Sequence, residues 1–225
     1  MASTDQHLDY PGAKPAGQSP SPAETRAATA AGAPGAVAWG NSAPLALAGF
    51  ATTTFMLSMI NTGLVPAGTL PVVFGVAFAF GGLAQLIAGI IQLRTGNTFG
   101  GMLFTGYGAF WLSLWAIAEF FLKSVQPLEV GHALGLFLYA FGIFTVVMFA
   151  ASLRTSVIVV TTLFLLGVTF FVLGAGNYGA SSGLIKTGGW IGLAVAALAF
   201  YLALAEVCEA TYGRAILPLF PLAKH

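Results

Sequence analysis

Charged residues are what this sequence most conspicuously lacks. Its 225 residues include 8 lysines and arginines and 7 aspartates and glutamates, or 7% of the chain, whereas a soluble domain carries about 25%. Hydrophobic residues make up 57%, and the mean hydropathy is +0.88. No charged residue occurs between Ala27 and Leu93. This composition excludes a soluble domain, and the absence of clustered Lys and Arg excludes a nucleic-acid-binding protein.

Residues that serve enzymes and metal sites are also scarce. The single cysteine, Cys208, cannot form an internal disulfide and has no partner at metal-ligand spacing. Of the three histidines, His7 and His225 lie near the chain ends and His132 begins an apolar segment. No Ser/His or Cys/His pair at membrane depth follows from these positions, and the sequence contains no P-loop, HExxH or CxxC motif. We therefore expect a protein that is not an enzyme and holds no metal or other cofactor.

Long apolar segments make up most of the remaining chain. A helix needs about 20 apolar residues to cross a bilayer. Six windows meet this requirement, at about 44–63, 70–92, 99–121, 131–151, 155–174 and 187–206. Short polar or Gly- and Pro-containing segments separate them. The sequence predicts an all-α membrane protein with six transmembrane helices per protomer, in one domain that spans residues 41–206.

The two ends of the chain are predicted to be tails. Residues 1–40 are rich in Ala, Pro, Ser, Gly and Thr with few large apolar side chains, which is typical of disorder. Residues 207–225 form a shorter C-terminal tail. With six spans, two basic residues lie on one side of the membrane, Lys123 and Lys186. Six lie on the other, Lys14, Arg26, Arg94, Arg154, Arg214 and Lys224. Since Lys and Arg near helix ends favour the cytoplasm, we expect both tails to be cytoplasmic in the cell (plasma) membrane. A five-span alternative, with one window only interfacial, would separate the termini and lose this asymmetry.

Polar residues within apolar segments are candidates for a substrate pathway, although many such residues only link helices. Asn41 and Ser42 precede the first span, where either side chain can cap the first turn. Pro44 occupies an early helical position at which the backbone N–H that proline lacks is not required. The same turn can present backbone amides to an anion. Side chains that can donate hydrogen bonds to a carboxylate follow further along the chain, at Asn61, Gln85, Thr105 and Asn177.

Two carboxylates lie near the ends of expected spans, Glu119 and Glu206. Such a group can reach the interface or form a structural ion pair. Because desolvation favours the neutral form of a carboxyl group, a partly buried Glu206 is also a candidate for exchanging a proton in step with a substrate. No Lys or Arg lies in the central part of any span. A pathway for anions through these helices would therefore bind its substrate weakly.

The segments 41–50 (Asn-Ser-Ala-Pro-Leu-Ala-Leu-Ala-Gly-Phe) and 96–100 (Gly-Asn-Thr-Phe-Gly) resemble the acetate uptake transporter family. Further matches follow in the family's order, at 82–85, 107–112, 189–193, 201–203, 206–207 and 213–218. Ser42 and Ala46 stand where the family motif has Pro and Gly. This family includes the bacterial succinate-acetate permease. The resemblance implies a six-helix protomer with its own pathway. It also implies assembly as a homohexamer and transport of acetate, and in some members of succinate.

The resemblance also implies roles for individual residues. The family's hydrophobic constriction corresponds to Phe50, Tyr107 and Leu166, of which Tyr107 alone is able to donate a hydrogen bond. The motif before the first span makes Asn41, Pro44 and Leu45 candidates for substrate binding. Glu206 matches the family pattern and Glu119 does not, so Glu206 alone remains the candidate for proton coupling.

From the sequence we therefore expect a permease for acetate or a similarly small monocarboxylate, which acts within the lipid bilayer. The scarcity of cations in the spans also allows a channel for a small neutral solute such as water, ammonia or urea. A third class is a membrane protein that does not transport and acts in assembly or acetate sensing. Channel-like and proton-coupled mechanisms both remain open at this point.

Overall fold

The computed structural model describes residues 39–223. The expected disordered tail over residues 1–40 lies almost wholly outside the described residues. The main helices are α2 (Ala43–Asn61), α3 (Leu70–Val76), α4 (Gln85–Arg94), α5 (Thr98–Ala116), α6 (Val130–Ser152), α7 (Val157–Tyr178) and α8 (Ser182–Tyr212).

Several shorter segments extend these helices to membrane length. The 3₁₀ turn η1 (Ala67–Thr69), α3, the π-helix η2 (Ala77–Ala84) and α4 follow one another as one apolar helix, Ala67–Arg94. In the same way α5 continues through η3 (Ile117–Phe121) and η4 (Leu122–Ser124), and η5 (Pro127–Glu129) leads into α6. The described residues thus form six helices that are long and apolar enough to cross a membrane. The predicted all-α fold with six spanning helices is confirmed.

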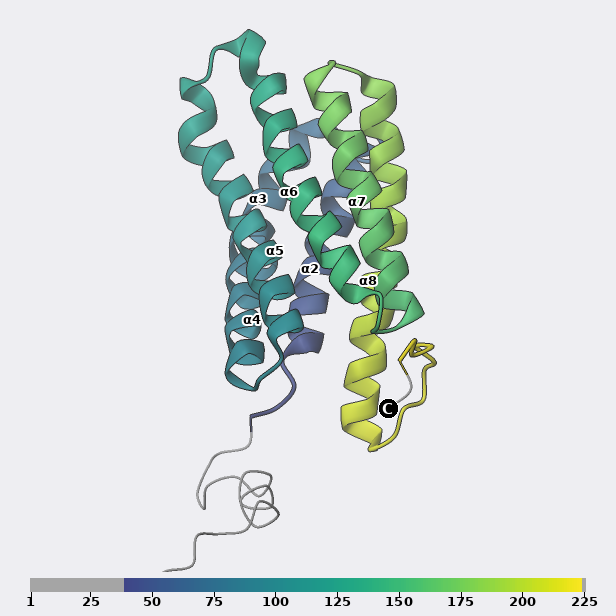
Figure 1. Cartoon of the computed structure of the whole chain (residues 1–225). Helices are drawn as coiled ribbons and strands as arrows, with labels where there is room; N and C mark the ends of the chain where they lie inside the picture. The colour runs from purple at the N-terminus through teal and green to yellow at the C-terminus, as the bar shows by residue number, and fades with distance from the viewer. Residues whose placement is uncertain (1–38, 224–225) are drawn as a thin grey trace, which may run out of the picture. The chain divides into compact units, whose positions relative to one another are not determined.

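Helix ends coincide with residues that the backbone requires there. Gly96 and Gly213, with φ of 86° and 68°, follow the last residues of α4 and α8 in the left-handed region that glycine adopts without strain. At helix starts, the Asn97 side chain accepts a hydrogen bond from the Gly100 amide at 2.9 Å. Ser156 caps α7 in the same manner. These caps hold the connections short, so consecutive helices run antiparallel (Figure 1).

The helices pack as a bundle in which α2 lies against α8, α7 against both α6 and α8, and α4 against α5, while η2 contacts α2 and α5 (Figure 1). Glycines permit the close approach of α8 to α2. A Cβ on Gly189 would lie 2.6 Å from the backbone nitrogen of Thr62, and one on Gly192 would overlap Ser58 Oγ. Large apolar side chains such as Phe120, Leu136 and Ile143 remain exposed on the outside of the bundle. Such a surface is stable in lipid, and the protein is an integral membrane protein.

The C-terminal segment is attached to the bundle. The sixth expected span ended at residue 206, whereas α8 continues to Tyr212, so Glu206 lies inside the helix. After Gly213 the chain returns toward the α6–α7 turn (yellow in Figure 1). There the Val157 amide donates to the Phe220 carbonyl at 3.0 Å, and the Leu222 amide donates to the Thr155 carbonyl at 2.9 Å. The predicted tail is therefore partly helix and partly a docked segment.

Candidate functional site

The described helices enclose two neighbouring cavities that border the candidate site. The upper cavity has a volume of about 360 Å³ and is lined mainly by α2, α5, α6 and α7 toward the 62–69 connection. The lower cavity, of about 220 Å³, is lined by the N-terminal halves of α2, α5 and α7, by Gln85 of α4 and by the last part of α8. Phe50 and Leu166 line both. These two side chains therefore lie at the boundary where the cavities meet.

Phe50 of α2, Tyr107 of α5 and Leu166 of α7, which we call the neck, are buried at this boundary, with 6%, 3% and 4% of their surfaces exposed. The Phe50 and Tyr107 ring centroids are 5.5 Å apart. Tyr107 also meets the edge of Phe144 at 5.4 Å and stacks on Phe170 at 6.4 Å. The structure thus brings together, from three helices, the residues that the sequence predicted for a constriction.

The hydroxyl of Tyr107 has a buried partner. It lies 3.0 Å from Thr145 Oγ1 of α6, and Thr145 Oγ1 in turn donates to the Phe141 carbonyl at 2.7 Å. Thr145 is fully buried. Ring packing and this hydrogen bond together hold Tyr107 in one orientation, which a loosely packed aromatic residue would lack.

A chain of side-chain hydrogen bonds borders the lower cavity. Asn41 Nδ2 donates to Glu206 Oε2 at 2.9 Å, and Gln92 Nε2 donates to Asn41 Oδ1 at 3.0 Å. Asn97 Nδ2 then donates to Gln92 Oε1 at 2.6 Å. This amide network, Glu206–Asn41–Gln92–Asn97, joins α8, the segment before α2, α4 and the start of α5. Glu206 and Asn97 also line the lower cavity.

The turn before α2 is held by the same network. Ser42 Oγ donates to the Ala88 carbonyl at 2.8 Å and accepts from Gln92 Nε2 at 3.0 Å. The Ala43 amide donates to Asn41 Oδ1 at 3.0 Å, so Asn41 satisfies one free amide of the first turn. Pro44 occupies that first turn and is half-buried. Leu45 is 44% exposed and lines neither cavity.

The remaining polar candidates are divided between the cavities. Gln85, 1% exposed, lines the lower cavity, and its Oε1 has no hydrogen-bond partner among residues 39–223. Asn61 and Asn177 line the upper cavity, and Asn177 Nδ2 donates to a carbonyl of its own helix at 2.8 Å. Thr105 is half-buried, donates to a carbonyl of α5 at 2.6 Å and lines neither cavity.

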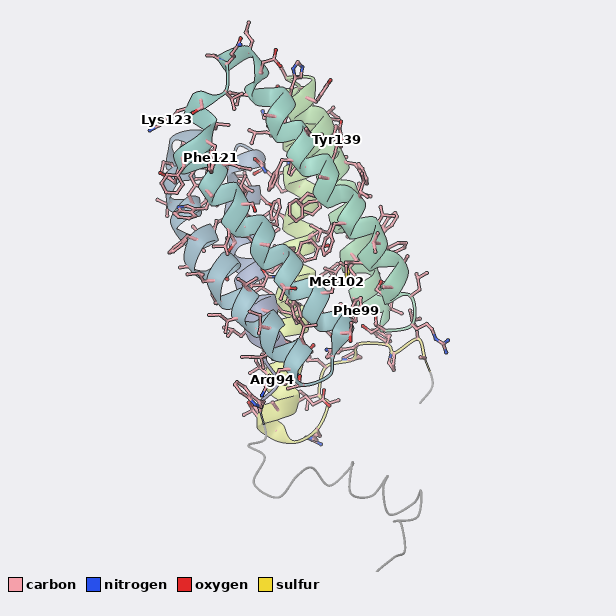
Figure 2. All side chains as sticks on the ribbon, turned by 60° about the vertical axis from the view of Figure 1, so that its left-hand side comes forward. Arg94, Phe99, Met102, Phe121, Lys123 and Tyr139 are labelled. Atoms are coloured by element: carbon pink, nitrogen blue, oxygen red, sulfur yellow. The ribbon has the colours of Figure 1, made fainter. Side chains whose placement is uncertain are left out.

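Charge is confined to one end of the interior. Of the described side chains that line the cavities, Glu206 alone carries a carboxyl group, and none is Lys, Arg or His. The basic residues of the connections, such as Arg94 and Lys123, are exposed. Figure 2 shows these two at opposite ends of the bundle. The interior formed by residues 39–223 therefore offers hydrogen bonds and apolar surface to a solute, without a fixed cation.

Two buried residues of the site, Gln92 and Thr145, were not singled out from the sequence. Both are polar residues in apolar helices, which is the class that indicates a pathway or a helix link. Each contacts a partner from a distant part of the chain, Asn41 and Tyr107 respectively. Spacing within one helix does not show such a pairing.

Comparison with known proteins identifies relatives of this chain. The family model described as the GPR1/FUN34/yaaH family matches residues 27–224. The succinate-acetate/proton symporter SatP of Escherichia coli K12 is 37% identical over 179 residues, which cover 80% of this chain and 94% of SatP. The ammonia transport outward protein 2 of Saccharomyces cerevisiae is 38% identical over 188 residues, covering 81% of this chain and 66% of the yeast protein. The solved structure of the bacterial acetate channel SatP aligns with a TM-score of 0.75 at 36% identity, covering 81% of this chain and 99% of that one.

Proposed function

The chain belongs to the GPR1/FUN34/yaaH family, and from this membership and the paired cavities we propose that it transports acetate or a similarly small monocarboxylate across a membrane. The observation that carries the proposal is the neck: Phe50 and Leu166 line both cavities, so a solute that moves from one to the other passes between them. SatP, the bacterial relative, is named for succinate, acetate and protons.

The neck selects by size and by charge in this proposal. A two-carbon acid presents a methyl group that the apolar side chains of Phe50 and Leu166 tolerate. Larger acids clash sterically with these side chains. Each additional ionised group must also lose its hydration without an opposing charge, which costs several kcal/mol. The site therefore favours small acids with one carboxyl group.

Glu206 is the proposed site of proton exchange with the substrate. It is half-buried, lines the lower cavity and receives a hydrogen bond from Asn41. The polar atoms of Asn41 are engaged by Glu206, Gln92 and the Ala43 amide. We therefore assign Asn41 to the orientation of Glu206, and Gln85 to hydrogen bonding with the substrate in the same cavity. Asn61 and Asn177 would serve the substrate in the upper cavity.

Export or passage of ammonia is the second candidate function. The yeast relative named for outward ammonia transport is 38% identical, and the cavities, whose described lining has no cation side chain, accept a neutral molecule equally well. Glu206 favours the acid, because a carboxylate must gain a proton to become neutral, whereas neutral ammonia can cross without a group that exchanges protons.

Uptake of labelled acetate into proteoliposomes tests the proposal. We expect saturable uptake that excess unlabelled acetate inhibits and that an inwardly directed proton gradient, with the outside more acidic, stimulates. Protein-free liposomes serve as the control, because acetic acid also crosses lipid unaided. Ammonia entry, followed by an internal pH dye in the same vesicles, separates the second candidate. A folded protein without saturable acetate uptake would contradict the proposal and leave ammonia passage or acetate sensing.

We also propose that both ends of the chain are cytoplasmic. Among described residues, Arg94, Arg154 and Arg214 belong to the connections and segment on the side where α2 begins, against Lys123 and Lys186 on the opposite side. Excess Lys and Arg mark the cytoplasmic side. In a Cys208→Ser background, a membrane-impermeant maleimide added to whole cells should label Gln126→Cys and not Thr95→Cys. The reverse pattern would invert the topology.

Assembly as a homohexamer is proposed from the family resemblance. The exposed apolar faces of the bundle are compatible with contact between protomers as well as with lipid. Native mass spectrometry of the protein released from detergent measures the number of chains directly. A monomer that retains acetate transport would show that each pathway works without its neighbours.

A further inference from the structure

The direction of the hydrogen bonds at the neck follows from their chemistry. The Phe141 carbonyl can only accept, and Thr145 Oγ1 has a single proton, which it donates to that carbonyl at 2.7 Å. The contact of 3.0 Å between the Tyr107 hydroxyl and Thr145 Oγ1 is therefore donated by Tyr107. Because a phenol also has a single proton, the Tyr107 oxygen retains only lone pairs for a solute in the lower cavity, which Tyr107 lines.

We infer that Thr145 is a positioning residue that makes the neck select the protonated, neutral form of a small carboxylic acid over the carboxylate. A neutral acid donates its O–H to the Tyr107 oxygen. A carboxylate has only acceptor oxygens, which would face the lone pairs of Tyr107. This inference rests on the proposed function and adds to it the chemical form in which the substrate crosses.

The surroundings of the neck point the same way. Phe50 and Leu166 offer no hydrogen bond, and no Lys, Arg or His lines either cavity in the described part of the chain. Besides Tyr107, the described lining of both cavities contains one ionisable side chain, Glu206 of α8. A carboxylate at the neck would be desolvated without an opposing charge, whereas a neutral acid is not penalised in this manner.

Tyr107 thereby takes a different role from the expected one, and Glu206 gains a definite task. The sequence presented Tyr107 as the neck residue able to donate a hydrogen bond, but its proton is committed to Thr145. A carboxylate that enters the lower cavity takes a proton from the Glu206 carboxyl group, and the resulting acid carries it through the neck. Glu206 is then reprotonated from water on its own side, and the acid releases the proton on the other side.

Two probes of acetate size separate the two forms. Acetamide is never ionised and can donate N–H to Tyr107, whereas methanesulfonate is always an anion. In proteoliposomes with equal pH on both sides, we expect excess acetamide to inhibit labelled acetate uptake by the wild type and methanesulfonate to leave it unchanged. Uptake at a fixed, subsaturating total acetate concentration should fall steeply between pH 5 and pH 8. The limit is about tenfold per pH unit, since a carboxylic acid ionises at about pH 4 to 5.

Variants then locate the selection. Thr145→Val removes the acceptor and frees the Tyr107 proton to point into the cavity. We expect methanesulfonate to become an inhibitor and the pH profile to flatten. Thr53→Val is the matched control, because Thr53 is equally buried, also bonds to a carbonyl four residues earlier and lines neither cavity. Glu206→Gln should retain the wild-type ranking of the probes, since it lies away from the neck.

The outcomes separate this inference from the function on which it rests. Equal inhibition by methanesulfonate and acetamide in a wild type that transports acetate would overturn the neutral-acid inference alone. Identical probe rankings and pH profiles in Thr145→Val and Thr53→Val, with both proteins folded, would overturn it as well. If the wild type takes up no acetate, the proposed function fails first, and the inference fails with it.

Discussion

The two cavities differ in how they handle charge. The lower cavity is bordered by a carboxylate held in an amide network, from Glu206 through Asn41 and Gln92 to Asn97. The upper cavity is larger and is lined by neutral side chains, of which Asn61 and Asn177 are the amides. Between them lies the apolar neck. Among the described residues, one cavity thus has an ionisable group that the other lacks, and the proposed function assigns proton exchange to the lower cavity and size selection to the neck.

The neck itself should be the most sensitive position. Phe50→Ala removes the ring that lines both cavities, so they should merge, and uptake of a four-carbon acid relative to acetate should rise about tenfold or more, because a few methylene groups decide selection in an apolar pocket. Labelled butyrate and acetate uptake by the same vesicles measures the ratio. Phe55→Ala is the control, since Phe55 lies on the same helix and is 44% exposed. An unchanged ratio would remove Phe50 from the neck.

The lower cavity should lose its proton donor in Glu206→Gln. This change keeps the shape of the side chain and a polar partner for Asn41. We expect acetate uptake to fall severalfold at pH 7 and to recover toward the wild-type value near pH 5, where free acid is more abundant. Glu209→Gln, an exposed carboxylate on the same helix, serves as the control. Equal pH profiles for the two variants would show that Glu206 does not exchange a proton with the substrate.

The amide network can be cut without touching either cavity lining. Gln92 is 5% exposed and lines neither cavity, yet it joins Asn41, Ser42 and Asn97. Gln92→Leu leaves these partners unsatisfied, which should lower the free energy of unfolding by about 1–3 kcal/mol. Thermal unfolding in detergent measures the change, with Gln126→Leu in an exposed connection as the control. We expect only a small loss of uptake at pH 7, because Glu206 remains.

The smallest effect concerns the C-terminal segment. Tyr201 donates to the Pro218 carbonyl at 2.8 Å in an exposed position. Tyr201→Phe removes this hydrogen bond, which contributes about 0.5–1.5 kcal/mol, and should speed protease cleavage between residues 213 and 223 without altering acetate uptake. Tyr212→Phe, on the same helix and 67% exposed, provides the comparison. Equal cleavage rates would show that the backbone contacts of Phe220 and Leu222 suffice to hold the segment.

Much of the fold could be predicted because membrane insertion depends on local composition. Each span is an uninterrupted apolar window, and breakers such as Gly96 and Pro127 separate neighbouring windows. The helix ends were less predictable. α8 extends to Tyr212 because the last turns remain helical until Gly213 adopts a left-handed conformation, and no change in apolar composition marks that point.

The site was predicted in part. Resemblance to known motifs pointed to Phe50, Tyr107 and Leu166, which the structure brings together. Screening polar residues in apolar segments found Gln85 and Asn177 beside the cavities, but it also selected Thr105, whose hydroxyl bonds to its own helix. Residue type is visible in a sequence, whereas the direction in which a helical side chain points depends on which neighbours the helix packs against.

The sequence by itself determined that this protein lies in a lipid bilayer and how many times it spans it, because both depend on how many apolar residues follow one another. It also determined the family, because the family's motifs occur in order. Tertiary structure alone decided that Thr145, 38 residues from Tyr107, accepts a hydrogen bond from the Tyr107 hydroxyl, and that Asn41, 165 residues from Glu206, donates a hydrogen bond to the Glu206 side chain. The physical reason is that hydrogen bonds join atoms within about 3 Å, and only helix packing sets which atoms come that close. The scarcity of charged residues therefore showed that this protein lies in a membrane, and helix packing decided which hydrogen bonds its few polar side chains form.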